Sequence, residues 1–245
     1  MLWYKAWRES QARFLLSALA IAGLCAAFVV FHREGMLSVE DGHLTYIGYI
    51  WRITYKTYLR ELFAILVLLL GVGGLLRERA YGTAGFTLAL PVSRLGLIWA
   101  RAGVGFLEVA ALSFLPALVI PALSPFVHQS YPWTQALQFG ALWTVGGALI
   151  LTMGFLASVI FASEYSAPVA ALLILLLYSV IADLPFLERY PVDIHDIMSG
   201  VGMRYFQPNT SLLTGPLPWT AQAVILLIVC GLIALAGRIT QQQDF

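Results

Sequence analysis

The stretch LLRERAYGTAGFTLALPVSRLGLIWARA, residues 75–102, interrupts a largely apolar chain. In it, arginines, one glutamate, a Gly-Thr pair and the sequence Pro-Val-Ser-Arg stand between two long apolar runs, residues 59–76 and 95–123. Two membrane-crossing helices can be joined by a handful of residues, so this connection is longer than a plain hairpin requires. The two apolar runs predict two membrane-crossing helices, and the polar connection between them needs an explanation of its own.

The composition places the chain in a membrane. Of its 245 residues, 60% are hydrophobic and 11% are charged, and the mean hydropathy is +0.83. A water-soluble domain carries about 25% charged residues, so this chain has too few charges to cover a soluble surface. The 14 basic and 13 acidic residues nearly cancel, which argues against a nucleic-acid partner. We therefore expect an integral membrane protein that contacts lipid.

Apolar runs of about 20 residues, the length of a membrane-crossing helix, occur six times. They lie near residues 14–31, 59–76, 95–123, 139–162, 167–182 and 219–236. This pattern predicts an all-α membrane protein with six transmembrane helices. The third run contains Pro116 and Pro121, which predict a kink or a break near its far end.

The basic residues beside the predicted spans indicate the orientation. If the N-terminus is inside, the cytoplasmic set is Lys5, Arg8, Arg13, Arg77, Arg79, Arg94, Arg101 and Arg238, and the outer set is Arg33, Arg52, Lys56, Arg60, Arg189 and Arg204. Basic residues are enriched on the cytoplasmic side of membrane proteins, and the larger set then lies inside. An even number of spans places both ends of the chain on one side, so we expect both termini to be cytoplasmic.

Three segments outside the spans carry their own patterns. In residues 1–13, two tryptophans and Ser10 share one sector of a helical wheel with charged residues opposite, which predicts an amphipathic helix at the membrane interface; the alternative is a frayed basic segment before the first span. Residues 32–58 are rich in tyrosine and tryptophan, which indicates an aromatic belt before the second span. Residues 183–218 contain five prolines among apolar residues and predict short broken helices on the outer membrane surface.

The inner part of the opening stretch predicts a short helix. Gly82 followed by Thr83 is typical of a turn and a helix N-cap. Pro91 ends this helix, because the residue before a proline avoids the helical region. Ser93 can cap the next helix, with Arg94 at the lipid headgroups. The residues between Thr83 and Pro91 are mostly apolar and must bury a face against something, so the segment suits docking of a cytoplasmic partner.

These residues resemble the coupling-helix region of the permeases of type-2 ABC transporters. The matching features are a glutamate before a Gly-Thr pair, here Glu78, Gly82 and Thr83, and the sequence Leu-Pro-Val-Ser-Arg at residues 90–94. The resemblance extends over the whole chain, from the amphipathic N-terminal helix through six spans and an outer segment before the last span to the polar ending RITQQQDF. It implies that residues 77–94 form a cytoplasmic coupling helix, which docks into a cleft of an ATP-binding subunit and carries its motion to the spans.

The resemblance also implies partners and a location. Residues 1–245 would form a single transmembrane permease domain of an ABC exporter in the inner (plasma) membrane, paired with a second copy or with a sister permease. The implied contacts with the ATP-binding subunit are Arg77, Glu78, Arg79, Gly82, Thr83, Phe86, Pro91, Ser93 and Arg94. The alternative is that these are ordinary interfacial charges and turn residues, as in many membrane proteins, and then no docking follows.

The chain has no nucleotide-binding motif of its own. A Walker A loop needs Gly-x-x-x-x-Gly-Lys-Ser/Thr, and the sequence contains no Gly-Lys pair. The glycine clusters at residues 71–74 and 103–105 fall inside predicted spans, where glycine allows helices to pack closely. We therefore expect ATP and Mg²⁺ on the partner subunit and no cofactor on this chain.

Glu108 lies about thirteen residues into the third predicted span, roughly 20 Å deep at helical rise. A carboxylate at that depth is costly, and it usually faces protein or a water-filled cavity. Two interpretations stay open: a residue of the translocation pathway that meets a cationic or polar substrate, or a hydrogen-bonded acid that bridges two helices. Arg101, two turns earlier, is interpreted as an anchor at the inner interface.

Two other functions are the alternatives: an intramembrane lipid-modifying enzyme, and a passive membrane anchor or assembly factor. The four histidines lie in outward segments without metal-ligand spacing, and the sequence contains no His-Glu-x-x-His and no nucleophile elbow. Asp193, His195 and Asp196 cluster on one outer loop, which we interpret as a solvated polar patch and not as a metal site. No catalytic or metal-binding residue is predicted.

Overall fold

The structure, a computed structural model, is mostly helical and confirms the predicted all-α membrane protein. It describes residues 2–32, 45–72, 94–161, 165–182, 184, 193–201, 203, 205–207 and 210–242. Its elements in chain order are α1 (Leu2–Val30), α2 (Tyr46–Ile50), the π-helix η2 (Trp51–Lys56), α3 (Tyr58–Gly71), α6 (Arg94–Leu123), the 3₁₀-helix η3 (Ser124–Val127), α7 (Trp133–Ile160), α8 (Ser166–Ala182), α9 (Ile194–Ser199), β1 (Phe206–Gln207), β2 (Leu212–Leu213) and α10 (Trp219–Gln242).

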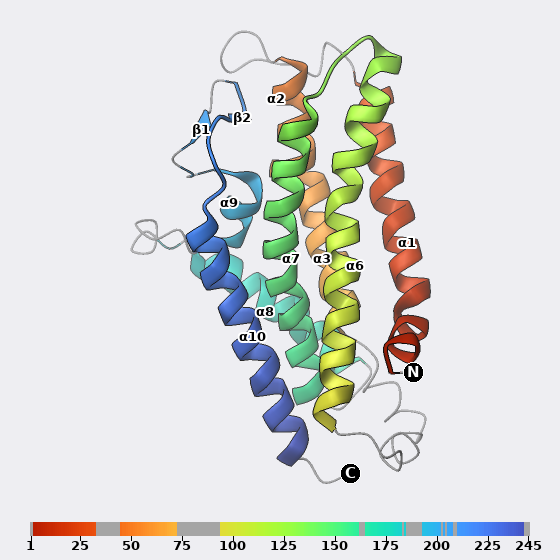
Figure 1. Cartoon of the computed structure of the whole chain (residues 1–245), viewed down its shortest axis with the longest axis vertical. Helices are drawn as coiled ribbons and strands as arrows, with labels where there is room; N and C mark the ends of the chain where they lie inside the picture. The colour runs from red at the N-terminus through yellow and green to blue at the C-terminus, as the bar shows by residue number, and fades with distance from the viewer. Residues whose placement is uncertain are drawn as a thin grey trace.

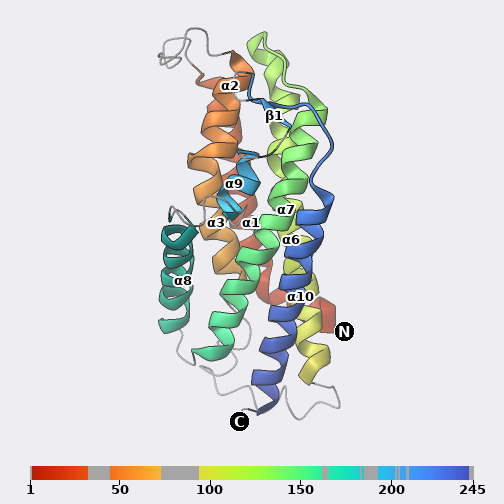
Figure 2. The same cartoon turned by 90° about the vertical axis from the view of Figure 1, so that its left-hand side faces the viewer.

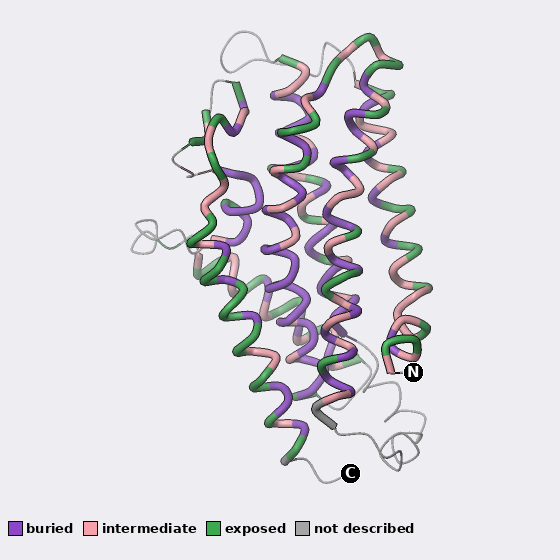
Figure 3. Tube along the Cα trace, in the orientation of Figure 1, coloured by how far each residue is buried: buried purple, intermediate pink, exposed green. Residues whose placement is uncertain are grey.

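The long helices stand side by side in one bundle (Figures 1 and 2). Helices α1, α6 and α8 run in one direction, and α3, α7 and α10 run in the other. Helix α7 lies at the centre, where it packs against α3, α6, α8 and α10. It is buried along most of its length, whereas much of α8 and α10 is exposed (Figure 3). Both ends of the chain lie at the same end of the bundle (Figure 1).

Four helices in the described part of the chain are long and apolar enough to cross a membrane. They are Leu2–Val30, Gly96–Val127, Trp133–Ile160 and Trp219–Gln241. The other two predicted spans coincide with shorter helices, α3 with 14 residues and α8 with 17. The membrane class of the protein is thus confirmed, while the number of six spans stays a prediction.

The predicted helix 1–13 is the beginning of α1 and not a separate element. Its first turns contact α6: a Cβ atom on Gly103 would meet the ring of Trp3, and Glu9 forms an ion pair with Arg101. Ser10, beside Glu9, reaches Glu108 one to two turns further along α6. Figure 1 draws the start of α1 bent away from the axis of its remainder. Its place at a membrane interface stays a prediction.

Of the kink or break expected at the prolines of the third span, the break does not occur, and the kink stays a prediction. Helix α6 continues through Pro116 and Pro121 and ends at Leu123, where the chain passes into η3. A proline removes one backbone hydrogen bond from a helix, and neighbouring helices stabilise a helix despite that loss. Helices α1 and α7 pack along α6 and provide this support.

The expected aromatic belt in residues 32–58 is wrong for three of its members. Tyr49, Trp51 and Tyr55 are buried inside the protein, and of the described members only Tyr58 is strongly exposed. Tyr55 stacks on Phe139 of α7, with 4.3 Å between the ring centroids. Helices α2 and η2 turn these rings toward α7, so burial against protein replaces contact with lipid headgroups.

The segment before the last span forms a small cap on α7. The short helix predicted there exists as α9, and Met198 on it packs where Gly146 leaves space. A two-stranded antiparallel hairpin follows, which the sequence did not predict; in it Leu213 pairs with Phe206. The side chain of Gln135 on α7 holds the hairpin, because it exchanges hydrogen bonds of 2.7 and 2.9 Å with the backbone of Leu213.

Candidate functional site

The predicted docking segment lies almost entirely outside the described residues. This applies to Arg77, Glu78, Arg79, Gly82, Thr83, Phe86, Pro91 and Ser93, and of Arg94 only the backbone is described. Helix α6 begins at Arg94, directly after the predicted cap. Helix α3 ends and helix α6 begins toward the end of the bundle where α1 begins (Figures 1 and 2).

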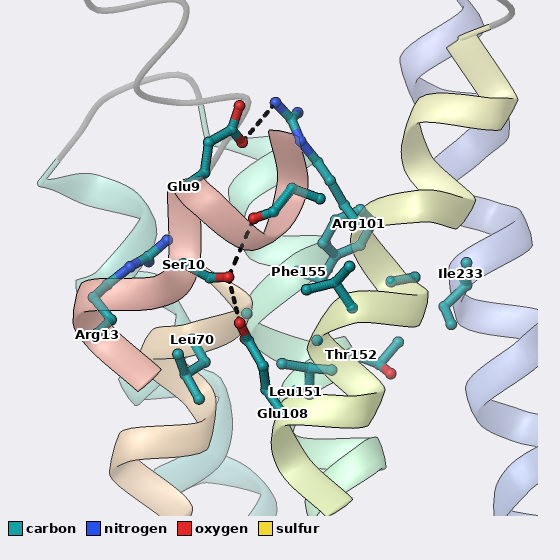
Figure 4. A pocket seen from close by; sticks show the side chains of 15 residues that line it. Glu9, Ser10, Arg13, Leu70, Arg101, Glu108, Leu151, Thr152, Phe155 and Ile233 are labelled. Carbon is teal, nitrogen blue, oxygen red and sulfur yellow. Dashed lines mark hydrogen bonds and ion pairs between the residues drawn. The ribbon is translucent and has the colours of Figure 1, made fainter. Parts of the chain in front are cut away.

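Glu108, the predicted intramembrane acid, lies between α6 and the start of α1. Its side chain is buried, with 3% of the residue exposed. The hydroxyl group of Ser10 on α1 donates a short hydrogen bond to Glu108 Oε1 (Figure 4). A buried carboxyl group is tolerated when a hydrogen bond replaces its lost hydration. Glu108 therefore bridges α1 and α6, which is the geometry expected of a hydrogen-bonded acid between two helices.

Arg13 ties α1 to the last turn of α3. Its Nη1 donates hydrogen bonds to the backbone carbonyl of Leu69, at 3.0 Å, and to that of Val72. The last carbonyl groups of a helix have no partner within the helix, and they carry the negative end of its dipole. A guanidinium group satisfies both needs, so Arg13 acts as a C-terminal cap supplied by another helix.

A second link joins α1 to the start of α6. Nη2 of Arg101 lies 3.1 Å from Oε2 of Glu9, and the arginine side chain is only 7% exposed. Lys5 lies 3.9 Å from the other oxygen of Glu9. Arg101 therefore points inward to a partner on α1, and its role as an anchor at the inner interface stays a prediction. A buried arginine needs such a partner because an unpaired charge is costly there.

These five residues form what we call the polar junction: Glu9, Ser10, Arg13, Arg101 and Glu108. They surround a cavity of about 50 Å³ whose other walls are mostly apolar (Figure 4). Small-molecule sites occupy roughly 300–1,000 Å³, so this cavity is far smaller than a substrate site. The geometry thus supports the bridging interpretation of Glu108, and its role in a translocation pathway stays a prediction.

Sequence reasoning missed most of the polar junction. It singled out Glu108 and Arg101 without their partners, named Ser10 only for its place on the helical wheel, and placed Arg13 among the general cytoplasmic charges. The available signal was the local coincidence of an intramembrane acid with polar residues at the start of the first span. That signal did not identify partners, because residues 98 positions apart in sequence are paired by helix packing alone.

The fold and the polar junction define an all-α integral membrane protein. In it, the start of α1 is joined to α3 and to α6 by hydrogen bonds and an ion pair. No model of a known protein family matches the chain, and no curated protein matches it. Within the described residues, no group of three or more His, Cys, Asp or Glu side chains could hold a metal ion.

Proposed function

We propose that this chain is the membrane-spanning permease subunit of an ATP-driven ABC exporter. It works with a separate ATP-binding subunit, which carries ATP and Mg²⁺, and with a second copy or a sister permease. The observation that carries this proposal is the sequence of residues 77–94, which resembles the coupling helix of type-2 ABC permeases. In this proposal the domain crosses the inner (plasma) membrane six times with both termini in the cytoplasm, and residues 77–94 dock on the ATP-binding subunit.

The polar junction supports this proposal because it connects both flanks of the docking segment. Arg13 bonds the end of α3, which precedes the segment. Glu9 and Ser10 bond Arg101 and Glu108 on α6, which follows it. A displacement of the segment by the ATP-binding subunit would therefore move α1, α3 and α6 together. Ionic and hydrogen-bonded links suit this role, since they hold helices at a defined register.

Co-purification of the two subunits tests the proposal. The variant combines Glu78→Ala with Phe86→Ala, and Tyr165→Ala is the matched control, because Tyr165 is an exposed aromatic residue on the connection between α7 and α8. A buried phenylalanine side chain contributes about 1.5–3 kcal/mol, and a hydrogen bond to a charged group contributes a similar amount. We expect association with the ATP-binding subunit to weaken roughly tenfold or more, with ATP hydrolysis no longer linked to transport.

The comparison requires equal amounts of each variant in the membrane. Neither substituted residue belongs to an apolar run, so insertion should be normal. Equal recovery of the ATP-binding subunit by the double variant and by Tyr165→Ala would identify residues 77–94 as ordinary interfacial residues. The lipid-modifying enzyme and the passive anchor would then become the leading functions.

A further inference from the structure

A second and larger cavity lies at the outer end of α8, between the start of α3 and α9. Its volume is about 390 Å³, within the range of roughly 300–1,000 Å³ that small-molecule sites occupy. The lining residues are Lys56, Thr57, Arg60, Glu61, Ser179, Asp193, His195 and Asp196. We call this space the outer cavity. It includes the outer-loop cluster that the sequence marked as a solvated polar patch.

The hydrogen bonds of His195 determine which ring nitrogen carries a proton. The Ser179 hydroxyl group donates to the carbonyl of Leu175 at 3.1 Å, and it also lies 3.0 Å from Nε2 of His195. A hydroxyl group has one hydrogen to donate. We assign that hydrogen to Leu175, the usual bond of a serine to the carbonyl one helical turn earlier, and this assignment makes Nε2 the donor to Ser179. In the neutral ring Nδ1 is then an acceptor without hydrogen.

This acceptor is buried and lacks a donor. Only 8% of His195 is exposed, and its Nδ1 has no hydrogen-bond partner among the described residues. Oε1 of Glu61 lies 4.0 Å away, which is too long for a hydrogen bond, and it is itself an acceptor. Two acceptors at this separation can both be reached by one N–H donor group placed between them. The most suitable donor is a primary ammonium, which has three N–H bonds and a positive charge.

The remaining charged residues of the outer cavity fit a ligand that carries both a positive and a negative charge. Arg60 is already engaged, since it donates to Glu61 Oε1 at 2.6 Å and to the carbonyl of His195 at 3.1 Å. Lys56 lies over the ring of Trp51, 5.4 Å from its centroid, at the cavity wall. Its ammonium group can meet a phosphate, while Glu61, Asp193 and Asp196 give the remaining wall an acidic excess.

The surroundings of the outer cavity are those of a lipid site. Helix α8 is apolar, and close to Ser179 it exposes Leu176, Leu177, Val180 and Ile181, each more than half accessible. In a membrane these side chains contact acyl chains. We propose that the outer cavity binds the headgroup of a phospholipid with a primary amine, an ethanolamine phospholipid, whose ammonium group lies between His195 and Glu61 and whose chains follow α8.

Native mass spectrometry of the purified full-length protein tests this site. Phosphatidylethanolamine, phosphatidylcholine and phosphatidylglycerol with identical acyl chains are offered at equal concentration. The choline headgroup is a quaternary ammonium without N–H bonds, and the glycerol headgroup has no ammonium, so neither can donate a charged hydrogen bond to Nδ1. We expect phosphatidylethanolamine to be retained roughly tenfold or more over the other two. Equal retention of the three lipids would overturn the proposal.

Substitutions locate the preference in the outer cavity. Glu61→Gln should reduce retention of phosphatidylethanolamine to the level of phosphatidylcholine, because the side chain keeps its shape and loses its charge. Arg52→Gln is the control, since Arg52 is exposed on the same π-helix and does not line the cavity. If Glu61→Gln does not fold, the exposed Asp196→Asn replaces it, with a smaller loss of preference expected. An unchanged lipid preference in the folded variant would contradict the site.

A soluble competitor distinguishes a lipid from a free solute. Phosphoethanolamine carries the same headgroup without acyl chains. If it displaces the lipid only at concentrations far above that of the lipid, the apolar face of α8 contributes as proposed. If it binds as tightly as phosphatidylethanolamine, the outer cavity is a site for a free amine and the lipid assignment is wrong.

Discussion

Arg13 is the residue on which the link between α1 and α3 depends. Its guanidinium group bonds two terminal carbonyls of α3, and no other residue of α1 forms a hydrogen bond to α3 in the described part of the chain. Hydrogen bonds to a charged group contribute about 1.5–3 kcal/mol. Arg13→Gln should therefore lower the thermal unfolding temperature of the purified protein. Arg8→Gln, an exposed arginine on the same turns of α1, is the control and should leave it nearly unchanged. If both variants unfold alike, Arg13 is not the cap of α3.

Two substitutions of Glu108 distinguish a residue of the translocation pathway from an acid that bridges two helices. Glu108→Gln keeps an oxygen that can accept from Ser10, so we expect nearly normal stability. Glu108→Leu removes that acceptor, and the Ser10 hydroxyl then donates only to the carbonyls of Ala6 and Trp7 on its own helix. The loss of the bond between the helices should cost about 0.5–1.5 kcal/mol. Thermal unfolding measures both effects, and similar stabilities of the two variants would contradict the bridge.

Transport by the stable Glu108→Gln variant then tests the pathway role. A charge that meets substrate cannot be removed without changing the rate or the selectivity of transport. Unchanged transport of every tested substrate, with normal recovery of the ATP-binding subunit, would end the pathway interpretation and leave Glu108 as a bridge between α1 and α6.

At the scale of helices, α3 and α7 approach each other closely where they cross. A Cβ atom on Gly71 would lie 2.2 Å from the carbonyl oxygen of Leu151, and one on Gly154 would lie 2.3 Å from that of Leu68. The two glycines thus let two backbones touch, as small residues do in membrane proteins. The prediction that glycine in the 71–74 cluster permits close packing is confirmed for Gly71.

Gly154→Ala tests this crossing, with Gly231→Ala as its matched control. Both residues lie inside helices, where alanine is intrinsically better than glycine by about 1 kcal/mol. Nothing lies within 4 Å of a Cβ atom on Gly231, so that variant should be as stable as the wild type or more so. The Gly154 variant must push α3 away from α7 and should unfold at a lower temperature. A Gly154 variant as stable as the Gly231 variant would show that the helices can separate freely.

At the scale of the whole molecule, the arrangement of the helices predicts the topology. The end of α10 and the connection between α6 and α7 lie at opposite ends of the bundle (Figure 1). Gln241 belongs to the first of these and Ser130 to the second, and both residues are exposed. Single cysteines at these positions, in a chain without Cys25 and Cys230, can be labelled by a reagent that does not cross membranes. We expect Ser130→Cys to react in intact cells and Gln241→Cys to react only after permeabilisation. The reverse pattern would place both termini outside.

The sequence by itself determined the class of this protein and where most of its helices lie. Apolar length is a local property, because the bilayer requires about 20 consecutive apolar residues of any spanning helix, so a run can be recognised without knowing its neighbours. Gly71 of the α3–α7 crossing was recognisable from its local glycine cluster, whereas Gly154 was not singled out. The proline break failed because the effect of a proline depends on helices α1 and α7, which pack along α6 and which no local window contains.

Only the tertiary structure decided which polar groups meet. Ser10 and Glu108, Arg13 and the end of α3, and His195 and Glu61 are each distant in sequence, and their pairing depends on the register and crossing of packed helices. The same applies to Tyr49, Trp51 and Tyr55, whose composition suits a membrane interface or a protein core equally well. Burial against α7 resolved that ambiguity, since a side chain faces lipid or protein according to its position on an assembled bundle.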